Sequence, residues 1–302
     1  MIKFNKYNLA VMELTLAGVI WGASFTLVRW TLEDFSATTL IFWRLIIAFV
    51  VGEVLHYFAN KSLFRSSWSD ARLAMFAGLF LGLSLLFQTY GLNYTSVTNS
   101  GFITSLYVVL IPIIAALFFK HKIKPHHVVL SLMAFAGMGF LLNMDSFSFH
   151  LGEILTLGAA FTAAFQIMFI GKVAKYAKSA FRFNSYQTFW SWVTILPFLV
   201  IEVRTKKISL WPEHVSWLSV VSLVSLALFV SILAFYLQVR AQRILSTTTS
   251  SMLCLLEGPF AFIFAAFFLS EKLEGIQLFG AFIILLSCGL SVFMDRPKGH
   301  AI

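Results

Sequence analysis

The chain has 302 residues, of which 59% are hydrophobic and only 12% are charged, and its mean hydropathy is +0.87. Soluble globular proteins carry about a quarter of charged residues, so this composition excludes an ordinary soluble domain and favours a membrane protein. The net charge of +9 does not indicate a nucleic-acid partner, because the basic residues lie in short loops between apolar runs.

Apolar runs of about 20 residues recur from one end of the chain to the other, which is the length that crosses the hydrocarbon core of a bilayer. In lipid the backbone must satisfy its own hydrogen bonds, so spans of this length are expected to be helices. The predicted spans lie near residues 10–30, 37–58, 73–93, 97–119, 125–143, 152–172, 184–203, 216–239, 247–269 and 275–294. The loops between them are too short for a separate soluble domain.

The distribution of Lys and Arg predicts the orientation, because cytoplasmic loops of membrane proteins are enriched in basic residues. With the N-terminus in the cytoplasm, 16 of the 22 basic residues fall on the inner side and five on the outer side, and Arg44 lies inside a span. Both termini are therefore predicted to be cytoplasmic.

A stretch of the first half recurs in the second half. Residues 88–139, moved forward by 150 positions, align with residues 238–289 without gaps and with 11 identities in 52 positions. Chance gives several matches in so apolar a chain, so the order of features is the better argument: a Ser/Thr cluster, an apolar helix, a short charged loop and a second apolar helix. This order indicates an internal duplication.

Each half contains five spans, an odd number, so the second half enters the membrane in the opposite sense. Inverted repeats of this kind are typical of secondary transporters. The sequence therefore predicts an all-α integral membrane protein with ten transmembrane helices in two inverted five-helix repeats, at residues 10–143 and 152–294.

Polar or ionisable side chains deep in a span are costly, and they mark functional sites by default. The predicted substrate-binding residues are Trp21, Arg44, Tyr107, Gln166, Trp190 and Glu257. Arg44 would hold an anionic group of the substrate or pair with Glu257. Burial disfavours the charged form of a carboxylate, so Glu257 is the candidate for binding a substrate amine or a coupling proton.

Each candidate has a structural alternative. Glu257 would then hydrogen-bond a neighbouring helix, Arg44 would extend to the outer interface, and the aromatic side chains would only pack. Gln88 and Gln238 fall toward span ends and are expected to make helix-end contacts. Two Gly-x-x-x-Gly pairs, Gly18–Gly22 and Gly78–Gly82, predict close helix packing.

Signatures of catalysis are missing from the sequence: it has no His-Glu-x-x-His, no Gly-x-Ser-x-Gly and no P-loop. An enzyme is not expected, and neither is a cofactor. His121, His126 and His127 lie among the lysines of an inner loop, so a metal site is not expected there. The only cysteines, Cys254 and Cys288, lie in apolar runs, which argues against a disulfide framework.

Five segments resemble EamA-type members of the drug/metabolite transporter superfamily: Trp21–Phe25, Phe42–Ala48, Asn99–Tyr107, Leu256–Pro259 and Ser270–Leu273. The resemblance implies ten helices in two inverted halves around a central cavity, and transport of small metabolites, often export of amino acids. Two features depart from the family pattern. A glycine separates Glu257 from Pro259 where the family usually has Glu-Pro, and the first repeat lacks the Gly-Glu ending of its ninth-helix counterpart.

These observations predict a secondary transporter that exports small organic metabolites such as amino acids across the inner membrane by alternating access. It would act as a monomer or homodimer, with the substrate, the lipid bilayer and a coupling proton as its partners. The first alternative is a passive facilitator without ion coupling. An intramembrane enzyme and a membrane scaffold are further alternatives, and each lacks the motif or partner surface that it needs.

Overall fold

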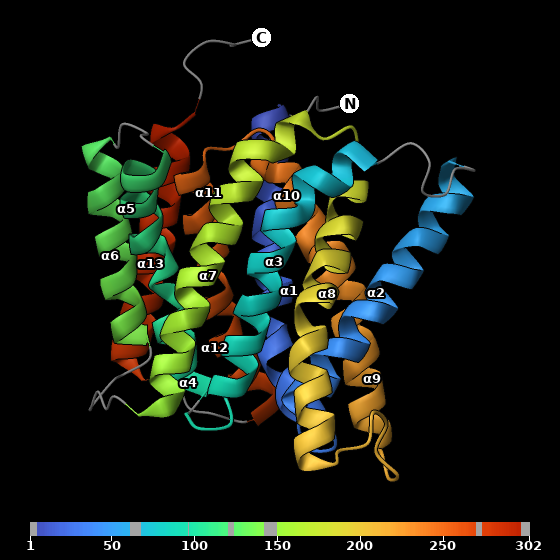
Figure 1. Cartoon of the computed structure of the whole chain (residues 1–302). Coiled ribbons are helices and arrows are strands. Elements are labelled where there is room, and N and C mark those ends of the chain that lie inside the picture. Colours follow the sequence, from blue (N-terminus) through green and yellow to red (C-terminus); the bar gives the residue numbers. More distant parts are fainter. Residues whose placement is uncertain are drawn as a thin grey trace.

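The computed structural model describes residues 5–60, 68–95, 97–119, 124–141, 150–269 and 274–296, and every regular element in these ranges is helical (Figure 1). The elements in chain order are α1 (Lys6–Thr31), α2 (Ala37–Asn60), α3 (Trp68–Gly91), α4 (Val97–Ser105), α5 (Tyr107–Phe119), α6 (Pro125–Leu141), α7 (Leu151–Val173), η1 (Ala174–Tyr176), α8 (Ala180–Lys206), α9 (Trp217–Ser225), η2 (Leu226–Ala234), α10 (Phe235–Gln242), α11 (Thr247–Cys254), α12 (Glu257–Leu269) and α13 (Gly275–Met294).

Six helical stretches of the described residues are long and apolar enough to cross a membrane, and two shorter apolar helices accompany them. The six are Lys6–Thr31, Ala37–Ala59, Trp68–Gly91, Leu151–Tyr176, Trp217–Gln242 and Gly275–Met294, and the shorter two are Ile103–Phe118 and Pro125–Leu141. All eight overlap predicted spans, with ends that differ by a few residues. The prediction of an all-α, multi-pass membrane protein is confirmed.

The predicted span 247–269 is broken in its middle into α11 and α12. Proline has no N–H to donate, so Pro259 cannot close the helical bond to the carbonyl of Leu255. The N–H of Gly258 donates to that carbonyl instead, at 3.1 Å, and the N–H of Leu256 donates to Leu253 at 3.2 Å. These shorter i→i+3 bonds tighten the chain just before Glu257, which becomes the first residue of α12.

The predicted span 97–119 is broken in the same way, into α4 and α5 at Leu106. The N–H of Leu106 donates to the carbonyl of Ile103 at 3.1 Å, again an i→i+3 bond. Leu106 and Leu256 are partners in the 150-residue alignment, so the two breaks lie at corresponding positions. Tyr107 therefore begins α5 as Glu257 begins α12.

A third irregularity lies in the span predicted at 216–239, where the π-helical segment η2 joins α9 to α10. A π-helix shifts the backbone hydrogen bonds out of the α-helical register, and such segments occur frequently at functional sites. Here the side-chain amide of Asn184 in α8 donates to the carbonyls of Ser231 and Ile232, at 3.0 and 3.1 Å.

Glycines bring the central helices close together, as the Gly-x-x-x-Gly pairs predicted. A Cβ added at Gly22 in α1 would lie 2.7 Å from the backbone nitrogen of Ala261 in α12, and one at Gly18 would lie 3.2 Å from Leu256 Cβ. At Gly78 in α3 it would lie 2.5 Å from Trp190 Cβ in α8. The first pair therefore lets α1 lie directly against the α11–α12 break.

In the bundle, α3 packs against α7 and α8, α1 packs against α12, and α6 pairs with α13 at one edge (Figure 1). The first turn of α1 lies beside the last turn of α13, because the Tyr7 hydroxyl donates to the carbonyl of Val292 at 2.8 Å. The two ends of the described chain therefore lie at the same end of the bundle.

Candidate functional site: a polar cavity inside the bundle

A cavity of about 110 Å³ lies among the central helices, and both halves of the chain line it. Its lining residues are Trp21, Ser24, Phe25, Val28, Arg44, Leu81, Ser84, Leu85, Gln88, Thr89, Leu92, Thr104, Tyr107, Ala163, Gln166, Ile167, Val230, Phe235, Gln238, Cys254 and Glu257. One carboxylate, one thiol and no histidine occur among them, so the described wall offers no set of metal ligands.

The structure brings five of the six predicted substrate-binding residues to this one cavity: Trp21, Arg44, Tyr107, Gln166 and Glu257. Trp190 is not part of the described wall. Its indole N–H donates to the carbonyl of Ala71 at 2.9 Å, and its Cβ packs against Gly78. These contacts give Trp190 a packing role between α8 and α3, and its predicted contact with the substrate stays untested.

Arg44 carries a buried positive charge to the cavity wall, with 4% of its surface exposed. Its Nε donates to the hydroxyl of Ser231 at 2.8 Å, which fixes the guanidinium against η2. Among the described residues no carboxylate forms an ion pair with Arg44, so the pairing with Glu257 that the sequence left open is not made in this structure. A buried charge without a counter-charge is costly, and the cavity is the place from which an anion would reach it.

Glu257 begins α12, where the free N–H groups of the helix start favour a negative charge. Its repeat partner Tyr107 lies close enough to interact with it electrostatically. The carboxyl group of Glu257 is the acceptor nearest to the Tyr107 hydroxyl. The indole N–H of Trp21 is a buried donor of the cavity wall that has no acceptor among the described residues.

Glutamines form a polar band along the wall. The side-chain amide of Gln166 donates to Gln238 at 3.3 Å, and that of Gln88 donates to Thr104 at 3.3 Å. Gln88 and Gln238 were expected to make helix-end contacts, and the structure places both on the cavity wall. The described wall takes in residues 81–89 of α3 and residues 235–238 of α10, so it includes positions near the ends of these helices. Glutamine occurs at both of these equivalent positions of the repeat, and this is the sequence signal that could have placed both residues in one site.

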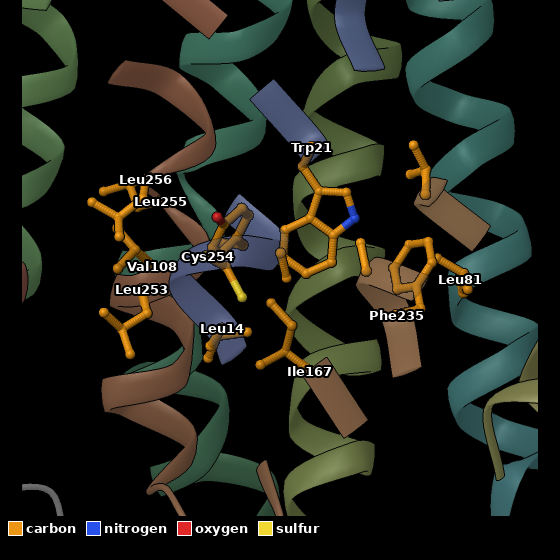
Figure 2. Packing of buried hydrophobic residues seen from close by; sticks show 14 of the residues in the cluster. Leu14, Trp21, Leu81, Val108, Ile167, Phe235, Leu253, Cys254, Leu255 and Leu256 are labelled. Atoms are coloured by element: carbon orange, nitrogen blue, oxygen red, sulfur yellow. The ribbon is translucent and has the colours of Figure 1, made fainter. Parts of the chain in front are cut away.

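Aromatic rings cover another part of the wall. The rings of Trp21 and Phe235 lie 5.4 Å apart between centroids, and Phe235 begins α10 directly after the π-helical segment. Figure 2 shows Trp21 with Phe235 on one side and Cys254 on the other. Sequence reasoning missed Phe235, because a phenylalanine in an apolar span carries no signal that separates a cavity wall from a packed core.

A bundle of membrane-spanning helices around a small cavity with charged, polar and aromatic walls is an arrangement typical of membrane transporters. The model of the EamA-like transporter family matches residues 8–143 and 150–293, and the chain belongs to this family.

Relatives agree with this assignment. The chain is 32% identical over 278 residues to an uncharacterized transporter of Archaeoglobus fulgidus, with 92% of this chain and 84% of that protein covered. It is 26% identical over 301 residues to the uncharacterized transporter YetK of Bacillus subtilis, with 96% and 88% covered. A solved crystal structure shares the fold at 15% identity, with a TM-score of 0.74 over 95% of this chain and 97% of that one.

Proposed function

We propose that this protein is a secondary transporter that exports small zwitterionic metabolites, such as amino acids, across the inner membrane by alternating access. The observation that carries the proposal is that a guanidinium group, from Arg44, and a carboxyl group, from Glu257, line the same cavity without forming an ion pair with each other. Arg44 would hold the carboxylate of the substrate and Glu257 its amine.

An unpaired donor supports a ligand of this kind. Buried polar groups in proteins nearly always have hydrogen-bond partners, yet the indole N–H of Trp21 has none among the described residues. A substrate with a carboxylate or carbonyl oxygen would supply the missing acceptor. Trp21 and Phe235 would then receive the apolar part of the solute.

The size of the cavity supports a compact solute. Its volume of about 110 Å³ is well below the roughly 300–1,000 Å³ of pockets that enclose drug-sized ligands. We include Trp190 as a predicted contact only for a conformation in which α3 and α8 have separated, because α3 covers it here.

We propose ten membrane spans in two inverted repeats, residues 10–143 and 152–294, with both termini cytoplasmic. The helix breaks at the equivalent positions Leu106 and Leu256 support the repeat. The Tyr7–Val292 contact supports an even number of spans, because it holds the start of α1 and the end of α13 at the same end of the bundle. The junction between the repeats, near residues 145–151, lies largely outside the described residues. Half-helix ends beside a central site are the arrangement that inverted-repeat transporters use to bind charged groups.

Proton coupling is proposed through Glu257, the single carboxylate of the described cavity wall. A proton and a substrate amine would compete for it, so their binding would be linked. The export direction rests on the family resemblance alone. A facilitator without ion coupling is the second candidate, and it is favoured if Glu257 only holds the N-terminus of α12.

Matched ligands test the proposal without any mutation. Binding of a labelled amino-acid panel to the purified protein in detergent is competed with the corresponding amines, which lack the carboxylate, and acids, which lack the amine. The account expects both truncated series to compete at least about tenfold more weakly, because each leaves a buried charged group unpaired. Equal competition by the amines would refute the role of Arg44, and equal competition by the acids would refute that of Glu257.

A further inference from the structure

A second, larger cavity of about 690 Å³ opens at the end of the bundle where α1 begins and α13 ends. Lys124, His127, Ser246 and Asp295 are among its lining residues, and none of them lines the substrate cavity. His126 and His127 lie in the first turn of α6, whereas Asp295 follows the last residue of α13. The fold therefore brings together potential metal ligands that are far apart in the sequence.

The three side chains converge on one point. Nε2 of His127 lies 3.3 Å from Oδ1 of Asp295, and Nε2 of His126 lies 3.9 Å from the same oxygen. One ligand atom from each of the three residues falls within 4.8 Å of the others. Donors about 2.0–2.1 Å from a tetrahedral zinc ion lie about 3.3 Å apart, so only a small movement of His126 is needed to enclose an ion.

The His127 side chain is buried, with 6% of its surface exposed, whereas that of His126 is 27% exposed. Nε2 of His126, the nitrogen that faces Asp295, is nevertheless shielded from solvent and has no hydrogen-bond partner among the described residues. A buried nitrogen without a partner requires a physical explanation. A cation beside Oδ1 of Asp295 would provide one for this nitrogen, because neutral imidazole nitrogens are common metal ligands.

Hydrogen bonds fix the orientation of the Asp295 carboxylate. Its other oxygen, Oδ2, accepts hydrogen bonds from the hydroxyls of Ser246 and Thr249 at 2.7 and 2.6 Å, so Oδ1 is directed toward the histidines. Outer hydrogen bonds that orient a ligating carboxylate are typical of metal sites. Lys124, whose amine lies 3.5 Å from Oδ1, is 64% exposed and is free to turn away into the cavity.

We propose that His126, His127 and Asp295 form a binding site for a divalent transition-metal ion of the zinc class, with a fourth position open to the 690 Å³ cavity. Two imidazoles and one carboxylate are a ligand set that zinc accepts together with a water molecule. The ion would join the start of α6 to the end of α13 and, through Ser246 and Thr249, to the start of α11.

The sequence predicted no metal site here, because the histidines lie next to lysines. Asp295 is more than 160 residues away in the sequence, so its proximity to the histidines was not predicted. The carboxylate supplies both the negative charge and the third ligand, and only the packing of α6 against α13 brings it to the histidines. The site does not depend on the identity of the transported solute.

The test is equilibrium dialysis of the untagged full-length protein in detergent against Zn²⁺ alone. The wild type is expected to bind one ion per chain at this site. His126→Ala and His127→Ala are each expected to weaken it at least about tenfold, since even losing a supporting group costs 10–100-fold in affinity. His214→Ala removes an exposed histidine of the loop before α9 and is the matched control.

Folding of each variant is checked by circular dichroism, and His126→Ala is the mildest change because that side chain is 27% exposed. Co²⁺ gives a second readout, since a bound ion with nitrogen and oxygen ligands has a visible absorption spectrum that both histidine variants should lose. No saturable binding in the wild type would overturn the proposal. So would unchanged affinity in both folded variants, or a stoichiometry that falls only in His214→Ala.

Discussion

Tyr107 and Glu257 occupy equivalent positions 150 residues apart, each begins the second segment of a broken helix, and both lie on the wall of the same cavity. Two halves related by a two-fold axis bring equivalent residues together only near that axis. The proximity of this pair therefore suits a site at the centre of the proposed inverted repeat. The two residues are chemically different, so a symmetric backbone presents an asymmetric wall to a solute.

Arg44→Gln should weaken binding of a carboxylate-containing substrate by about 10- to 150-fold. A hydrogen bond to a charged group contributes roughly 1.5–3 kcal/mol, and 1.4 kcal/mol corresponds to a factor of ten. Equilibrium binding of a labelled amino acid measures the effect. Arg29→Gln, which removes an exposed arginine, should leave the dissociation constant unchanged, and an equal loss in both variants would contradict a specific role for Arg44.

Gly22→Ala should destabilise the protein by about 1–3 kcal/mol, the usual cost of overpacking a tight contact. The new methyl group would lie 2.7 Å from the backbone nitrogen of Ala261, which cannot move without displacing α12. Gly289→Ala in α13 is the matched control, because nothing lies within 4 Å of its added Cβ. Thermal unfolding in detergent should show a lower midpoint for the first variant and an equal or higher midpoint for the second, since alanine favours helix.

Glu53→Ala should be far more destabilising than Glu13→Ala. Both carboxylate oxygens of Glu53 lie 2.6 Å from Nη1 of Arg182, which is 2% exposed, and removing one partner of a buried ion pair costs about 3–5 kcal/mol. Glu13 is also buried and pairs with Arg240 at 3.0 Å, but that arginine is 43% exposed. Glu13→Ala therefore leaves behind a charge that solvent still reaches, which costs less than a charge left alone in the interior.

Thermal unfolding midpoints of the two variants compare these costs directly. In the double variant Glu53→Leu/Arg182→Met no buried charge is left without a partner, so most of the lost stability should return. A double variant as unstable as Glu53→Ala would show that packing, rather than the unpaired charge, causes the loss.

The stability contributed by Asp34 should disappear in acid. The nearby hydroxyls of Ser219 and Ser216 and the N–H of Ser216 hold the pKa of Asp34 below its ordinary value of 3.8. Ser216 donates to Oδ2 of Asp34 from both its N–H and its hydroxyl, at 2.9 and 2.7 Å. A lowered pKa in the folded state stabilises the protein above the ordinary value, and this contribution is lost as the pH falls through the folded-state pKa.

Unfolding midpoints of the wild type and Asp34→Ala, measured from pH 7 to pH 3, test this sign. Their difference should be constant down to about pH 5 and should then shrink. A difference that grows in acid would mean that the carboxyl group is stabilising in its protonated form.

Apolar length predicted most of the helices, because the bilayer requires long helices wherever the chain crosses it. The break before Glu257 follows from Pro259, whereas the break at Leu106 shows no such local cause in the sequence. Arg44 and Glu257 stood out because charge is rare in apolar spans. Trp190 was selected from the sequence and Phe235 was missed, since an aromatic side chain has the same local pattern in a cavity wall and in a packed core.

Long-range polar contacts were the least predictable part. Ser231, which fixes Arg44, and Asp295, which meets His127, are ordinary residues in their local sequence. Their contacts depend on how distant helices are aligned along the bundle axis, and no periodicity or composition records that alignment.

The most direct test of the account is uptake of a labelled amino-acid panel into proteoliposomes, with and without a pH gradient, for the wild type, Glu257→Gln and the control Glu33→Gln. Glu33 is exposed at the end of α1. The account predicts gradient-driven uptake that Glu257→Gln abolishes and Glu33→Gln retains. Uptake that is the same with and without the gradient, and the same in the wild type and Glu257→Gln, would contradict proton coupling through Glu257 and make the protein a facilitator.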